Sequence, residues 1–146
     1  MGRILGVIWI IVAVISGVVS GFSQVAGTDT DAISFLAGFA GQALWGILAG
    51  IAIGLTYWLI SKASASVVPI VFGWIHLVFY TLGSAAFMYG NVVRNAAMQG
   101  DGDFSMIGII YSAGAGLQII SSLIFIVALI VALASERGRP NHMRDY

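Results

Sequence analysis

Cysteine is absent from this 146-residue sequence, and charged residues make up only 8% of it. Without cysteine, the chain has no disulfide bond, no thiolate metal site and no cysteine nucleophile. Soluble domains carry about 25% charged residues, so the shortage of charge argues against a water-soluble fold. The six basic and six acidic residues balance, and no basic cluster is present to bind nucleic acid.

Catalytic signatures are missing as well. The sequence contains no recognisable nucleophile–base pair, phosphate-binding loop or zinc motif. We therefore expect no enzyme active site and no cofactor bound by this chain alone.

Apolar residues, in contrast, make up 60% of the chain. They form four long runs separated by short polar breaks, and each run is long enough to cross a bilayer. The runs predict helices at about 4–23, 33–61, 67–91 and 104–135, followed by a flexible tail at 136–146. The expected fold is a single all-α domain of four transmembrane helices. It would be surrounded by lipid in the inner (plasma) membrane or an equivalent energy-transducing membrane.

Basic residues near the helix ends predict the orientation. With an even number of spans, five of the six basic residues share one side, namely Arg3, Lys62, Arg137, Arg139 and Arg144. The other side holds Arg94 together with the loop carboxylates Asp29, Asp31, Asp101 and Asp103. Because positively charged loops stay inside, both termini are expected to be cytoplasmic.

Small residues recur every four positions along two predicted helices. On the second helix the residues of this ridge are Gly38, Gln42, Gly46, Gly50 and Gly54. Gly17 and Gly21 make a similar face on the first helix. Such faces let helix backbones approach closely, so we expect them to pack against another helix or a partner subunit.

Several spacings resemble a known family. They are Gly17-Val18-Val19 with Asp31, Ala37-Gly38-Phe39-Ala40 with Gly46 and Tyr57-Trp58, Ile75-His76 with Gly83, and Gly114-Ala115 with Phe125. In order and interval, they resemble helices IX to XII of subunit I of haem–copper terminal oxidases of the cytochrome c oxidase type. The resemblance covers nearly the whole chain.

The haem-ligating residues of that family are missing. The family's Ala-His-Phe-His corresponds to Ala37-Gly38-Phe39-Ala40 here, so both histidines are lost. The resemblance therefore implies a degenerate, non-catalytic relative, acting as an accessory subunit of a respiratory membrane complex. Its partner would be a histidine-complete oxidase subunit that carries the haem, contacted through the small-residue faces.

His76 is the one histidine inside a predicted span. One interpretation makes it a haem ligand, with a second ligand from a partner, in a haem-anchoring or electron-transfer subunit. The favoured interpretation is a neutral histidine that is hydrogen-bonded inside the bundle.

At the outer side, Asp31 is expected to cap the second helix. Arg94 is expected to pair with an outer aspartate or with a partner.

A third class of function is a small dimeric transporter or channel. Its path would be lined by helix-face polar residues, of which Gln42, Gln118, Ser112, Ser121 and Ser122 are candidates. Interhelical hydrogen bonding is the favoured role for these residues. No carboxylate lies within a predicted span, which argues against proton coupling.

Overall fold

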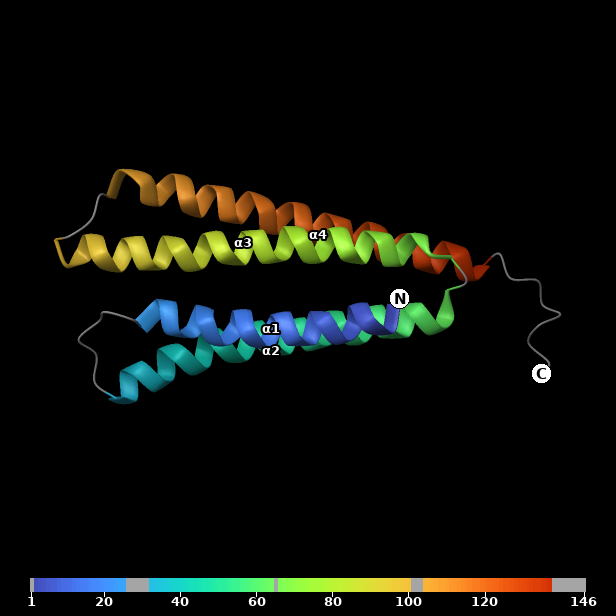
Figure 1. Ribbon diagram of the computed structural model, residues 1–146, viewed down its shortest axis with the longest axis horizontal. Helices are drawn as coiled ribbons and strands as arrows, with labels where there is room; N and C mark the ends of the chain where they lie inside the picture. The colour runs from blue at the N-terminus through green and yellow to red at the C-terminus, as the bar shows by residue number, and fades with distance from the viewer. Residues whose placement is uncertain (1, 26–31, 65, 101–103, 138–146) are drawn as a thin grey trace.

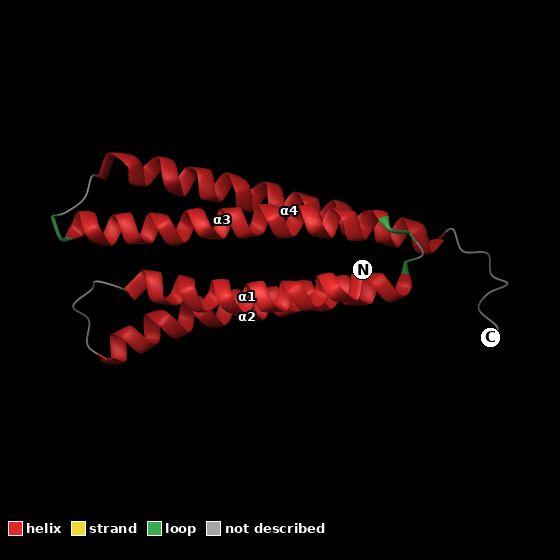
Figure 2. Ribbon diagram, viewed as in Figure 1, coloured by secondary structure: helices red, strands yellow, loops and turns green. Residues whose placement is uncertain are grey.

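The computed structural model describes residues 2–25, 32–64, 66–100 and 104–137. The helices in these residues are, in order, α1 (Gly2–Val25), α2 (Ala32–Ala63), α3 (Val68–Met98), the short 3₁₀ helix η1 (Phe104–Met106) and α4 (Ile107–Arg137). Four of them are long and apolar enough to cross a membrane. The expected all-helical fold with four such helices is therefore confirmed for the described part of the chain (Figure 2).

The helices form two antiparallel hairpins, α1–α2 and α3–α4, which meet mainly through α1 and α3 (Figure 1). One end of the bundle holds the start of α1, the connection from α2 to α3, and the end of α4 (Figure 1). We call this the terminal end. The opposite end, where α1 and α3 finish and α2 and α4 begin, is the distal end.

The third helix extends further than the sequence predicted, to Met98 instead of residue 91. The prediction placed the polar residues after position 91 in a loop. In the structure Asn91 and Asn95 are buried in the last turns of the helix and face α1. The helix ends just before Gly100, whose φ of 89° suits a residue without a side chain. The predicted fourth helix begins with the 3₁₀ turn before it becomes α-helical.

Glycines bring α1 and α2 into backbone contact. A Cβ placed on Gly6 would lie 2.7 Å from the carbonyl oxygen of Gly54, and one on Gly54 would lie 2.8 Å from that of Gly6. A Cβ on Gly50 would collide with the side chain of Ala13. The first hairpin therefore closes along a seam that larger residues could not share.

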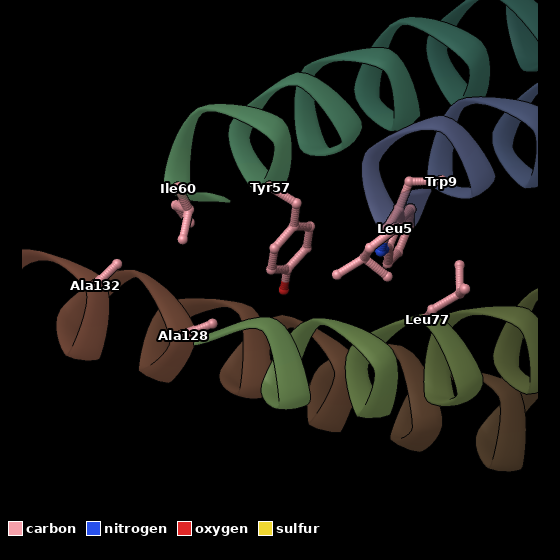
Figure 3. Packing of buried hydrophobic residues seen from close by; sticks show 7 residues of the cluster. All are labelled: Leu5, Trp9, Tyr57, Ile60, Leu77, Ala128 and Ala132. Carbon is pink, nitrogen blue, oxygen red and sulfur yellow. The ribbon is translucent and has the colours of Figure 1, made fainter. Parts of the chain in front are cut away.

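An apolar core fills the bundle towards the terminal end. Its buried apolar side chains are Leu5, Trp9, Tyr57, Ile60, Leu77, Ala128 and Ala132, and they come from all four helices (Figure 3). Tyr57 points from α2 across to the second hairpin and is fully buried (Figure 3). Gly73 of α3 makes room for it, because a Cβ there would lie 2.7 Å from the Tyr57 ring.

Hydroxyl groups within the helices mostly bond to their own backbone. Ser16, Thr56 and Thr81 each donate to the carbonyl four residues earlier, at 2.6 to 2.8 Å. Such bonds satisfy a hydroxyl locally, so it needs no partner in an apolar surrounding. Pro69 lies in the first turn of α3, where its missing N–H breaks no helical hydrogen bond.

Candidate functional site: a polar cavity between the hairpins

A cavity of about 480 Å³ lies between the two hairpins in the distal half of the bundle. All four helices line it, with α3 contributing most of the wall. The polar residues among the lining are Ser16, Ser20, Tyr80, Ser84, Asn91, Arg94, Tyr111 and Gln118. Gly17, Gly46, Phe87 and Met88 complete the described wall. In a bundle that is otherwise apolar, so many polar groups on one cavity are the clearest candidate for a functional site.

One hydrogen-bond chain fixes the distal part of this wall. The hydroxyl of Tyr111 on α4 donates to Oδ1 of Asn91 on α3. The Nδ2 group of Asn91 in turn donates to Oγ of Ser23 on α1, at 3.2 Å. Asn95 adds a second link, from its Nδ2 to the carbonyl oxygen of Ser23 at 3.1 Å. The chain joins α4 to α3 and α3 to α1, so it holds the two hairpins together beside the cavity.

Gln118 fixes the part of the wall that lies nearer the terminal end. Its Nε2 group donates to the carbonyl oxygen of Tyr80 at 3.3 Å and to Oγ of Ser84 at 3.1 Å. The amide lies against Gly83, where a Cβ would come within 3.0 Å of it. Gly83 therefore allows a polar side chain of α4 to cross onto α3.

Arg94 is the one charged residue among the described lining. Its Nε and Nη2 atoms lie 3.4 and 3.3 Å from Oδ1 of Asn95, which are long hydrogen bonds. No ion pair involving Arg94 occurs within the described residues. The expected outer aspartates Asp29, Asp31, Asp101 and Asp103 lie outside those residues, so the predicted pairing with them stays a prediction.

His76 lies on the terminal side of the cavity, among the side chains of the apolar core. It is 3% exposed, and its Nδ1 atom is 3.0 Å from the hydroxyl of Tyr57. Its ring is 4.4 Å from that of Trp9 and 5.2 Å from that of Phe125, measured between centroids. A haem ligand needs a free ring nitrogen and an open approach. The contacts of His76 instead describe a histidine held on one nitrogen and packed between aromatic rings.

Two other polar groups accompany His76 in the core. Ser121 of α4 is buried and donates to the carbonyl oxygen of His76 at 3.3 Å. The indole Nε1 of Trp9 is buried and has no hydrogen-bond partner among the described residues. Within those residues, no group of three or more His, Asp or Glu side chains lies close enough to hold a metal ion.

The predicted small-residue faces pack inside the chain. Gly46, Gly50 and Gly54 of α2 face α1, and a Cβ on Gly46 would lie 3.5 Å from Cα of Gly17. Gly21 is also buried on α1. Gly38 lies in α2, but its surroundings are outside the described residues, and so is the side chain of Gln42. The part of the ridge from Gly46 to Gly54 is thus occupied within the chain, and a partner subunit would have to bind elsewhere.

The other polar helix-face residues divide into three groups. Gln118 lines the cavity, Ser121 lies in the core, and Ser112 and Ser122 are exposed on the outside of α4. Sequence reasoning missed Asn91, Tyr111 and Ser84 as cavity residues. A signal for them was present, because cavity residues recur at helical spacing along α3, at positions 80, 84, 87, 91 and 94.

No protein family, curated protein or solved structure matches this chain.

Proposed function

We propose that this chain is a non-enzymatic integral membrane protein that binds a small polar molecule in the cavity between its hairpins, as a small carrier or receptor does. The observation that carries the proposal is the cavity itself, with eight polar side chains around about 480 Å³. Polar groups inside a membrane bundle are costly and are usually retained for a function. The volume falls within the range of pockets that hold small molecules.

In this proposal both termini face the cytoplasm. Arg3 and Lys62 lie at the terminal end, and basic residues favour the cytoplasmic side. The amine of Lys62 lies 3.7 Å from the centre of the Trp58 ring, a pairing suited to a membrane surface. The cavity would then belong to the outer half of the membrane, on the outer side of the apolar core, and its solute would arrive from outside.

A labelling experiment tests whether the cavity admits water and solutes. Because the chain has no cysteine, Ser20→Cys places a single thiol on the cavity wall with almost no change in shape. Val92→Cys is the control, since Val92 is 53% exposed on the outside of α3 and should face lipid. Membrane-impermeant thiol reagents added outside proteoliposomes should label Ser20→Cys and spare Val92→Cys. Equal labelling of the two, or none at Ser20→Cys, would remove the basis of the proposal.

An accessory subunit of a respiratory membrane complex is the second candidate. One observation favours it beyond the sequence resemblance. A Cβ on Gly108 or Gly116 of α4 would meet nothing within 4 Å, and Ser112 between them is exposed. These three residues are four apart and form an open small-residue face, which is the surface that a partner helix would use. The haem would then belong to the partner, not to this chain.

Purification in mild detergent tests this second candidate. A histidine-complete oxidase subunit I should co-purify with the chain and give a haem signal in the redox difference spectrum. Gly108→Leu and Gly116→Leu should weaken the association. Gly41→Leu, at another position where a Cβ would meet nothing within 4 Å, should leave it intact. Isolation of the unaltered chain alone and colourless would count against the accessory role.

A further inference from the structure

The hydrogen-bond donors of the cavity wall are unevenly used. The Tyr111 proton goes to Asn91, the Gln118 amide goes to Tyr80 and Ser84, and the Ser16 hydroxyl bonds to the carbonyl oxygen of Val12. These neutral groups therefore donate hydrogen bonds to acceptors within the protein. The hydroxyl groups of Ser20, Tyr80 and Ser84 also line the cavity and have no acceptor among the described residues, so they remain available as neutral donors.

Arg94 differs from these groups because it is the one charged donor in the described wall. A guanidinium has five N–H donors in a planar fork. The bonds of Arg94 within the described residues engage only Nε and Nη2, and both go to the same amide oxygen of Asn95. The Nη1 group and part of Nη2 keep their donors, and Arg94 is only part-buried at the cavity. Within the described lining Arg94 is the one charged residue, so the charge that this part of the wall carries is positive.

We propose that the ligand of this cavity carries an anionic oxygen group, such as a phosphate, which binds to the guanidinium of Arg94. This inference rests on the proposed function, because it names the chemistry of the solute. Guanidinium matches phosphate oxygens in geometry as well as charge. Ser20 of α1 and Asn91 of α3 line the same cavity and could add neutral hydrogen bonds to the bound group.

The anion has two possible sources, a soluble phosphate compound or the headgroup of a membrane lipid. An apolar groove of about 240 Å³ runs between α1 and α3. It shares Ser16, Ser84 and Met88 with the polar cavity, and its other walls include Val12 and Ile15. An acyl chain in this groove would lie next to a headgroup at Arg94, so both sources belong in the test.

The test uses Ser20→Cys in the full-length chain and two thiol reagents of similar size, one carrying a sulfonate and one a trimethylammonium group. With Arg94 present, we expect the anionic reagent to react faster relative to the cationic one, by about tenfold, because a charge in a confined cavity concentrates counter-ions. Arg94→Gln should abolish this preference, and Arg94→Lys should retain much of it. A preference unchanged in Arg94→Gln would overturn the inference. Absence of reaction with either reagent would instead defeat the proposed function.

Protection against labelling then identifies the source. Inorganic phosphate should slow the labelling of Ser20→Cys if the ligand is soluble. If it is a lipid, phosphatidylglycerol in the proteoliposomes should slow labelling relative to phosphatidylcholine alone, when measured with an uncharged reagent. Either protection should disappear in Arg94→Gln. If neither probe protects, no anion occupies the cavity and the inference fails.

Discussion

At the scale of single residues, the chain uses its few polar side chains in two different ways. In the core, His76 and Tyr57 bond to each other and are surrounded by aromatic rings. Around the cavity, Asn91 and Tyr111 bond to each other and also line the cavity wall. The first arrangement suits stability, and the second suits binding.

The His76–Tyr57 pair should contribute to stability and not to binding. Tyr57→Phe removes the hydroxyl but keeps the ring, so we expect the free energy of unfolding to fall by about 0.6–1.5 kcal/mol. Thermal unfolding in detergent, followed by circular dichroism, measures this loss. In a double-mutant cycle with His76→Ala, the two changes should be non-additive. Strict additivity would show that the pair is not coupled.

At the scale of helices, close approach is concentrated within the hairpins. Gly6, Gly50 and Gly54 bring the backbones of α1 and α2 together, and a Cβ on Gly114 of α4 would lie 3.4 Å from the carbonyl oxygen of Gly83 on α3. Between the hairpins, α1 meets α3 through larger side chains and through the Asn91 and Asn95 hydrogen bonds. Each hairpin is therefore the more tightly built unit.

The α1–α2 seam should not tolerate a large residue. Gly50→Leu would drive a side chain into Ala13, so we expect the protein to lose about 1–3 kcal/mol of stability or more. Gly41→Leu is the matched control on the same helix, because a Cβ there meets nothing within 4 Å. Melting curves of the two purified variants should differ clearly. Equal destabilisation by both would contradict the described seam.

Much of the helical pattern was predictable from the sequence, because long apolar runs allow few other structures. The end of α3 was not, since Asn95 looks like a loop residue until the carbonyl oxygen of Ser23 is seen to accept its hydrogen bond. The Gly46–Gly54 ridge was recognisable as a packing face, but not the helix that it meets. The cavity was hidden for the same reason, because it depends on how α1 pairs with α3.

At the scale of the whole molecule, the two ends of the bundle differ in chemistry. Towards the terminal end, side chains from four helices fill the interior, among them Leu5, Trp9, Tyr57, Leu77 and Phe125. Towards the distal end, α1 and α2 diverge, as do α3 and α4, and the polar cavity occupies the interior (Figure 1). The interior is therefore packed with apolar side chains at the terminal end and contains the polar cavity towards the distal end.

The predicted orientation can be tested on the intact chain. A green fluorescent protein fused to the C-terminus should fluoresce, and alkaline phosphatase fused there should be inactive, because both termini are expected in the cytoplasm. A phosphatase inserted in the 101–103 connection should be active. The opposite pattern would reverse the orientation and place the cavity on the cytoplasmic side.

The aromatic rings around His76 bear on whether the protein lets ions leak across the bilayer. Trp9, Tyr57 and Phe125 pack about one histidine, so aromatic rings fill the described interior at this level, and we expect them to block a continuous file of water. Planar bilayers containing the protein should show no ionic current under an applied voltage. We expect any solute that crosses to do so at the slow turnover of a carrier.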